Sequence, residues 1–219
     1  EWPLWGVSPG DPGDPALVEP SEDGTDLWPY TARAHDHDAR TLGINVIFYG
    51  DPADVRTALV ERSALEWEDE PEAEGEADGE TISADRIEID PEAEDIGDVI
   101  SWSDAEGSTR YAYFEIDGEG RWVDESYQLH AGTYLGERSH IRAYEDPNGE
   151  WTAVQIHEEH WDWFRLRHTV TGISDSQREL ESGFMGEPYT ETVVRMPFEN
   201  ETADSDGWVT GIYLVGAAL

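Results

Sequence analysis

The chain contains no lysine, and this absence says most about the solvent in which it folds. All 13 basic residues are arginine, against 51 Asp and Glu in 219 residues, so the formal net charge is -38. At low ionic strength so much like charge destabilises a compact state. At molar salt the Debye length falls to roughly 3 Å and most of the repulsion is screened. The composition therefore predicts a halophilic protein with an acidic surface, of haloarchaeal origin.

Cysteine is absent as well, which excludes disulfides, thiolate metal sites and cysteine nucleophiles. A basic stripe is also lacking and the negative field repels phosphate, so nucleic acid is excluded as a partner. Aromatic residues, in contrast, are plentiful, with 10 Trp, 9 Tyr and 5 Phe. Each can bury about 150–250 Å² of surface. We therefore expect a folded domain with a sizeable core and not a disordered acidic chain.

Composition along the chain suggests one domain with appendages. Residues 1–40 are rich in Pro, Gly and Asp and predict an extended arm, and residues 41–215 predict a single α+β domain. An acidic stretch at 66–95 predicts a loop insertion with a short edge strand at 86–89, and 216–219 form a tail. Trp2 and Trp5 are typical of a membrane interface next to an anchor. Asn200 begins an N-glycosylation sequon, which is meaningful if the chain is exported.

Local patterns predict a largely antiparallel sheet with two main helices. Asp51 is a good N-cap and Pro52 suits the first position of one helix. Ser174 to Gln177 is a capping-box sequence that opens the second helix, through about Ser182. Apolar alternation and turn residues predict strands at 42–49, 110–116, 121–129, 139–145, 150–157, 164–170, 189–198 and 208–215.

The turn sequence Asp146 to Gly149 predicts a β-hairpin. We expect the pairs Tyr144–Trp151, Arg142–Ala153 and His140–Gln155. Because side chains alternate between faces, Ile141, Ala143, Val154 and Ile156 share the core face. The other face then carries Arg138, His140, Arg142, Tyr144, Trp151, Gln155 and His157. This second face is interpreted either as a site for an anion or polar ligand or as a solvated face of arginine–carboxylate pairs.

Histidines after this hairpin form a candidate site for a divalent metal. Imidazole and carboxylate groups are the ligands that zinc or manganese takes in a chain without cysteine, which suggests His157, His160 and His168. The spacing of His157 and His160 does not match the zincin helix motif, and in an extended strand the two side chains point to opposite faces. No other cofactor is expected, because no phosphate-binding loop or catalytic triad order is present.

Several segments, in the right order, resemble the LssY C-terminal domain family. The strand and helix at 43–59 (GINVIFYGDPADVRTAL) are similar to the family's opening segment, and 138–144 (RSHIRAY) resembles its Arg-His-His-Leu-Arg-Leu-Trp strand. Residues 167–173, 175–179 and 205–208 resemble its later segments. The chain departs from the family at Ser139, in place of a paired histidine, and at Gln177, in place of an acidic residue. The resemblance implies a membrane-associated setting and no established reaction.

Three functional hypotheses follow from the sequence. The first is a non-enzymatic, extracytoplasmic binding or assembly domain of a haloarchaeal membrane or envelope protein, whose arm contacts a protein partner or a second copy. The second is a metal-assisted hydrolase of phosphate esters. It would use the catalytic candidates His140, His157, His168, Arg138 and Arg142, together with His160. The third is a cytoplasmic halophilic protein. Whether the chain is an enzyme is left open by its sequence.

Overall fold

The computed structural model describes residues 7–8, 16–21, 24–62, 68–69, 109–132, 136–164, 167–202 and 205–216. Trp2 and Trp5, nearly all of the acidic 66–95 insertion with its expected strand at 86–89, and tail residues 217–219 lie outside the described residues. The structure therefore does not test the predictions made for them.

One sheet is antiparallel and joins the first strands of the chain to two later ones. Its order is β1-β2-β3-β8-β4-β5, and β9 pairs with the other edge of β8. Strand β8 is therefore bordered on one side by both β3 and β4, through Leu27–Phe114 and Ala32–Tyr111. The strands are β1 (Val7–Ser8), β2 (Leu17–Val18), β3 (Thr25–Leu27), β4 (Tyr30–Ala32), β5 (Arg40–Gly43), β8 (Tyr111–Ile116) and β9 (Glu119–Asp124).

The other sheet holds the longest strands and is antiparallel except for one pair. Its order is β14-β15-β6-β12-β11-β10-β7, with β13 also pairing with β12, and β15 runs parallel to β6. The strands are β6 (Val46–Tyr49), β7 (Glu68–Asp69), β10 (Tyr127–Gly132), β11 (Glu137–Glu145), β12 (Trp151–Asp162), β13 (Arg167–Gly172), β14 (Thr190–Pro197) and β15 (Trp208–Leu214).

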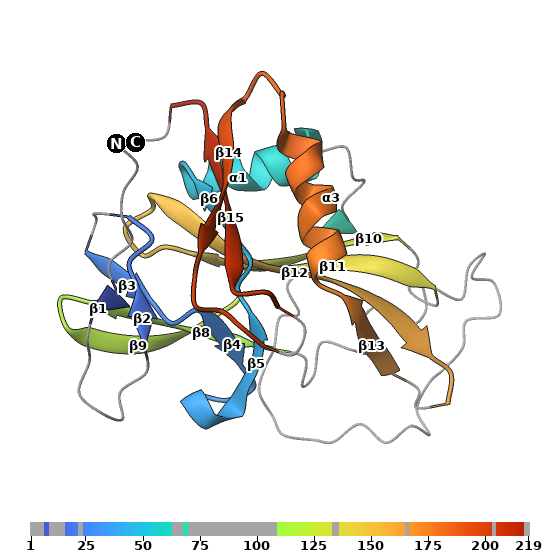
Figure 1. Ribbon diagram of the computed structural model, residues 1–219, viewed down its shortest axis with the longest axis horizontal. Coiled ribbons are helices and arrows are strands. Elements are labelled where there is room, and N and C mark those ends of the chain that lie inside the picture. Colours follow the sequence, from blue (N-terminus) through green and yellow to red (C-terminus); the bar gives the residue numbers. More distant parts are fainter. Residues whose placement is uncertain are drawn as a thin grey trace.

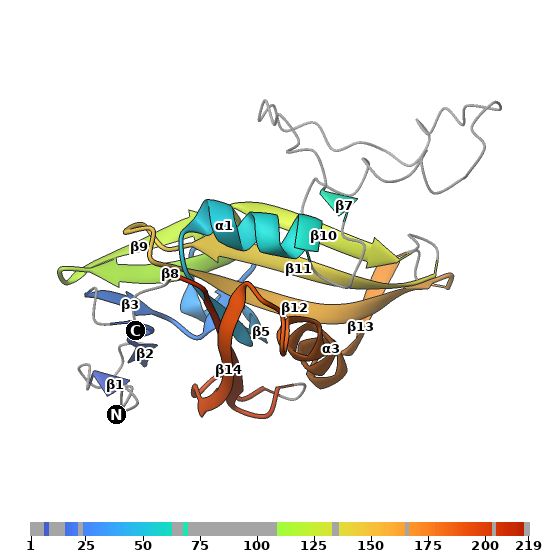
Figure 2. The same ribbon diagram turned by 90° about the horizontal axis from the view of Figure 1, so that it is seen from above.

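Two helical segments cover one face of this second sheet, and the first sheet packs on the other face. Helix α1 (Pro52–Thr57) continues into the π-helical turn η2 (Ala58–Arg62), and α3 spans Ser174–Phe184. Figure 1 shows α1 and α3 above β10, β11 and β12, with β3, β4 and β8 below them; Figure 2 gives the perpendicular view. Leu59, Leu180 and Phe184 pack on the helix side of the sheet, whereas Phe114 and Trp151 pack between the sheets.

The fold class is confirmed in part. Two helices and largely antiparallel strands are present, but the chain is richer in β-structure than expected and builds two sheets instead of one. The described part of the 1–40 segment contributes β1, β2, β3 and β4 to the first sheet, with Leu17, Trp28 and Tyr30 buried. This part of the expected arm is therefore integral to the fold.

The apolar run 42–49, expected to be one strand, is divided between the two sheets. Strand β5 ends at Gly43 and β6 begins at Val46, so Ile44 and Asn45 carry the chain from one sheet to the other. Gly43 permits this crossing, because a Cβ there would lie 2.6 Å from the carbonyl oxygen of Asn200. The Asn45 side chain then donates to Ile156 O and accepts from Ile156 N, both at 2.9 Å. The Asn45 side-chain amide thus supplies the hydrogen bonds to β12 that the β6 backbone, whose pairing ends at Val46, no longer makes.

The structure confirms the predicted start of α1 and the predicted hairpin, but not the predicted cap of α3. Asp51 caps α1 by accepting from Ala53 N, as predicted. The capping box at Ser174 is wrong, because the N-cap of α3 is Ile173 and no side chain caps it. The hairpin is confirmed, but its pairs are Tyr144–Ala153, Arg142–Gln155 and His140–His157. The predicted pairs are therefore wrong by two residues, a slip that leaves every side chain on its expected face because the side-chain period is two.

Among the described residues, no helix is long and apolar enough to cross a bilayer.

Candidate functional site

The polar face of the β11–β12 hairpin lies between the two sheets and is buried. Arg138, His140, Arg142, Gln155 and His157 each expose less than a tenth of their surface. The face is therefore not solvated, because β4, β5 and the segment before β8 cover this side of the hairpin, but the expected arginine–carboxylate pairs are present as Arg138–Glu159 and Arg142–Glu125. Tyr144 and Trp151, at the other end of the same face, belong to the apolar core, and the Tyr144 hydroxyl donates to Arg110 O at 3.2 Å.

Glu159 is the centre of this polar cluster. Its Oε1 accepts from Arg138 Nε at 2.7 Å, and its Oε2 lies 3.3 Å from His157 Nε2 and 3.9 Å from His140 Nδ1. His168 Nδ1 lies 4.0 Å from Oε1. Arg138, His140, His157 and His168, predicted as site residues, therefore do converge on one buried carboxylate.

His160 does not join them. Side chains alternate along β12, so His157 and Glu159 face the first sheet and His160 faces the opposite side. The bulge near this point lies in the β13 partner, where Glu158 pairs with Gly172 and Glu159 with Val170, so β12 keeps its alternation. The predicted ligand set His157, His160 and His168 is therefore not brought together by the structure.

A second carboxylate orders the neighbouring strand. Glu125 Oε1 accepts from Gln128 Nε2 at 2.6 Å and from Arg142 Nη1 at 2.9 Å. This contact turns the Gln128 amide so that its oxygen faces His140 Nε2 at 2.9 Å. An amide oxygen only accepts, so the His140 proton is held on Nε2 and the lone pair of Nδ1 points toward Glu159.

Burial sets the protonation of the histidines. It lowers the pKa of His130, with the Arg138 charge as the next cause, to about 3. Burial likewise lowers the pKa of His140 and of His157. For Glu159 burial alone would raise the pKa, but the contact with His157 Nε2 at 3.3 Å helps to outweigh it and the net direction is downward. At neutral pH His130, His140 and His157 are therefore neutral imidazoles beside an ionised carboxylate.

A pocket of about 490 Å³ opens beside this cluster, between the two sheets. Its most unusual feature is that four of the 13 arginines of the chain line it: Arg33, Arg40, Arg110 and Arg142. Among the residues that the structure describes, Glu159 is the single carboxylate in the lining. The remaining lining is mixed, with Thr31, Ala39, Thr41, Leu42, Gln155, His157, His168 and Val170.

Two carboxylates contact arginines at or beside this pocket. Glu125 pairs with Arg142, and Glu159 is engaged by Arg138. Arg40 lies over the Tyr30 ring at 4.6 Å, and within the described part of the chain neither Arg33 nor Arg40 forms an ion pair. Burial, then the charges of Arg142 and Arg33, lower the pKa of Arg110. Arg142 and Arg33 therefore lie close enough to Arg110 to repel its charge, in a chain that has 51 acidic residues.

Sequence reasoning missed the residues that come from other strands. Gln128 and His130 lie on β10 and alternate with the buried Tyr127 and Leu129, a period-two signal that was available in the predicted strand. Arg33, Arg40 and Arg110 carry no such signal, because the first sheet, which was not predicted, brings them to the hairpin.

The glycosylation prediction is corrected by the position of Asn200. This residue has no exposed surface, and its Nδ2 donates to the carbonyl oxygens of Ile44 and Trp208. A glycan on Nδ2 would remove these bonds and has no space in the folded protein. The sequon therefore gives no support for export.

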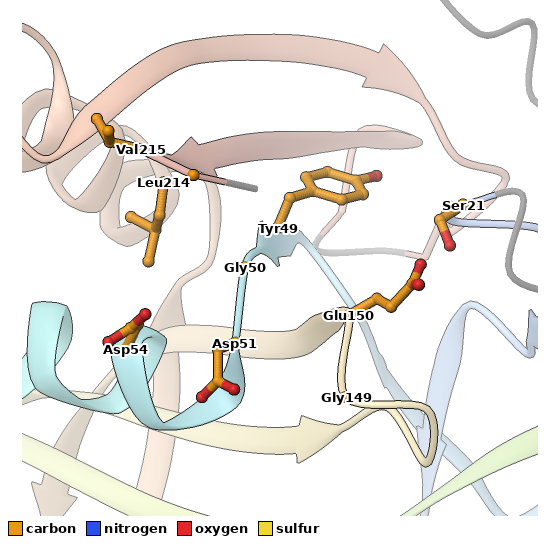
Figure 3. A pocket seen from close by; sticks show the side chains of 10 residues that line it. Ser21, Tyr49, Gly50, Asp51, Asp54, Gly149, Glu150, Leu214 and Val215 are labelled. Atoms are coloured by element: carbon orange, nitrogen blue, oxygen red, sulfur yellow. The ribbon is translucent and has the colours of Figure 1, made fainter. Parts of the chain in front are cut away.

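Another pocket, of about 280 Å³, has the opposite electrostatic character. Figure 3 shows Asp51 and Asp54 of the α1 region and Glu150 of the hairpin turn around it, beside Tyr49 and Leu214. The charged side chains that line it in the described part of the chain are all carboxylates, so an anion is repelled there. The arginine concentration is thus a property of the pocket between the sheets.

Comparison of the chain with protein-family models, curated proteins and solved structures gives no match.

Proposed function

We propose that the chain is a binding domain for a small organic anion, which the pocket between the sheets holds with Arg33, Arg40, Arg110 and Arg142. The observation that carries this proposal is the placement of four of 13 arginines around one pocket in a chain of net charge -38. These guanidinium groups can give a bound anion several charge-assisted hydrogen bonds by direct contact, which molar salt screens least.

The lining favours a phosphate or carboxylate group on an organic body. Guanidinium groups bind both through forked pairs of hydrogen bonds, which are about twice as strong as neutral ones. The Thr31 and Thr41 hydroxyls, 2.7 Å apart, add polar groups on the β4–β5 side. Leu42, Ala39 and Val170 offer apolar contacts for the remainder of the ligand.

Isothermal titration calorimetry in molar KCl tests the proposal with glycerol 3-phosphate and citrate as probes and glycerol as the neutral control. We expect Arg33→Ala and Arg40→Ala each to weaken anion binding by about 10–100-fold, since a hydrogen bond to a charged group contributes about 1.5–3 kcal/mol. Arg178→Ala is the matched control, because Arg178 lies on α3 with an exposed i,i+3 partner. Equal affinity for glycerol, or equal loss in Arg178→Ala, would refute the proposal.

A metal-assisted phosphate-ester hydrolase is the alternative function, supported by the convergence of Arg138, His140, His157 and His168 on Glu159. Hydrolysis of p-nitrophenyl phosphate, with and without added Zn²⁺ or Mn²⁺, separates it from simple binding. Turnover that disappears in His157→Ala but survives in His160→Ala would favour the enzyme. Binding of glycerol 3-phosphate without any turnover would favour the binding domain.

The proposed setting is the envelope or membrane of a haloarchaeon, supported by the composition and by the resemblance to the LssY C-terminal domain family. Assembly with a partner or a second copy is tested best by deleting residues 1–15, since a longer deletion removes strands β2 and β3. Light scattering of the deleted and complete chains in molar KCl gives the comparison. If the deletion leaves the molar mass unchanged, residues 1–15 are not needed for assembly. If the native protein is found in the cytosol, the proposed envelope setting is wrong.

A further inference from the structure

We propose a site for a zinc-type divalent transition metal formed by His130, His140 and Glu159. One ligand atom from each residue lies within 4.8 Å of the other two, and all three residues are buried. Two of them come from neighbouring positions on β10 and β11, which pair His130 with His140, and the third comes from β12. This set shares no residue with the three histidines that the sequence suggested as metal ligands, which are His157, His160 and His168.

The geometry at His140 favours a bound cation. Its Nδ1 makes no hydrogen bond and is buried, and it lies 3.9 Å from Glu159 Oε2. Because Gln128 holds the ring proton on Nε2, a lone pair and a carboxylate oxygen face each other across this gap. Two acceptors facing each other in a dry site repel, and a cation between them removes that repulsion.

The distances suit a transition metal. Bonds of about 2.0–2.2 Å from zinc to imidazole nitrogen and carboxylate oxygen place two ligands of a tetrahedral ion roughly 3.4 Å apart. The 3.9 Å gap between His140 Nδ1 and Glu159 Oε2 is about half an ångström wider, a difference that small side-chain rotations close. The His130 and His140 rings are stacked, with centroids 4.1 Å and planes 22° apart, so one ring has to rotate for both nitrogens to face the ion. Three protein ligands leave a fourth position for water.

The residues behind the ligands hold them in the orientation that a metal needs. Histidines that bind metals almost always donate the other ring N–H to an acceptor that fixes the tautomer. Here Glu125 orients Gln128, and the Gln128 oxygen accepts from His140 Nε2. The carboxylate of Glu159 is held in the same way, because Arg138 binds Oε1 at 2.7 Å and leaves Oε2 facing His140.

Cobalt(II) titration of chelator-treated protein, followed by visible absorption in molar KCl with excess Mg²⁺, tests the site. The Mg²⁺ occupies the many surface carboxylates, which bind hard cations, so saturable absorbance reports nitrogen ligands. We expect one Co²⁺ per chain, displaced by Zn²⁺. Gln128→Ala changes a residue behind the ligands and should weaken Co²⁺ binding by roughly 10–100-fold. His130→Gln and His140→Gln each remove a ligand and should weaken Co²⁺ binding by more than that.

His160→Gln is the matched control, since His160 lies on the opposite face of β12. Circular dichroism and tryptophan fluorescence establish that each variant is folded before titration. Absence of saturable Co²⁺ binding by folded wild-type protein would overturn the proposal, and so would His130→Gln binding as tightly as His160→Gln. Arg33 and Arg40 take no part in this metal site. A negative Co²⁺ titration therefore leaves the proposed anion binding by the pocket unaffected, and a negative anion titration leaves the proposed metal site unaffected.

Discussion

Replacement of Asn45 by alanine should be among the most damaging single changes in the fold. Asn45 is fully buried at the point where the chain passes from the first sheet to the second. Its side chain satisfies both the N–H and the C=O of Ile156, each at 2.9 Å. Asn45→Ala removes both partners at once and leaves two backbone groups of a central strand buried without them.

The magnitude follows from the two groups left unsatisfied. Each buried donor or acceptor without a partner costs about 1–3 kcal/mol, so we expect a loss of about 2–5 kcal/mol. That is a large fraction of the 5–15 kcal/mol typical of a whole domain. The Asn45 backbone bonds to Val154 O and from Thr210 N survive the change, so the crossing itself is retained.

Urea unfolding in molar KCl, followed by tryptophan fluorescence, measures the loss. The matched control is Asn148→Ala, which removes from an exposed turn residue a single hydrogen bond to Thr25, worth about 0.5–1.5 kcal/mol. If Asn45→Ala lost less than about 1 kcal/mol, or no more than Asn148→Ala, water or backbone relaxation would be replacing the side-chain amide. The account of the crossing would then be wrong.

Three further predictions concern polar residues that are buried or half-buried. Gln177→Leu should cost about 1–3 kcal/mol in the same urea assay, because Gln177 Nε2 donates to Asn45 O and Thr210 Oγ1 and so ties α3 to the sheet. Burial lowers the pKa of His37 below 6.5, with partial compensation by Asp36 and Asp38. The unfolded chain then binds the proton more readily, so stability should fall as the pH drops through 6.5. His37→Phe should reduce the difference in unfolding free energy between pH 7.5 and 5.5; an unchanged difference would contradict this. Asn200 should carry no glycan in intact-mass measurements of folded protein secreted from a glycosylating host, and a modified, folded chain would disprove its burial.

Local chemistry could be read from the sequence, whereas contacts between distant segments could not. The Asp51 cap and the Asp146–Gly149 turn depend on neighbours within four residues, and both were predicted. The division of the 42–49 run depends on the close approach of Gly43 to Asn200, which no local pattern reveals. An apolar run has the same appearance whether it stays in one sheet or crosses between two.

The candidate site divides along the same line. Alternation within the hairpin correctly placed Arg138, His140 and Arg142 on one face, even though the predicted pairing slipped by two residues. What alternation could not supply was the element covering that face. Arg33 and Arg40 reach the pocket only because β4 and β5 pair beside β8, which follows them by roughly 70 residues.

A substitution at Glu125 distinguishes two ways in which the arginine pocket could hold an anion. The anion is held either by the net positive charge of the pocket or by arginines that are fixed in position. Glu125 Oε1 accepts from Arg142 Nη1 at 2.9 Å, and Oε2 accepts from Arg110 N at 2.8 Å. Glu125→Gln removes a negative charge from beside the pocket and weakens the hold on Arg142. At molar salt, charges beyond roughly 3 Å are screened, so contact geometry should matter more than the field. We therefore expect Glu125→Gln to bind citrate about 3–10-fold more weakly, because an unfixed guanidinium loses conformational freedom on binding. Tighter binding in calorimetry would show that net charge dominates, and the pocket would then be an electrostatic trap without preorganised geometry.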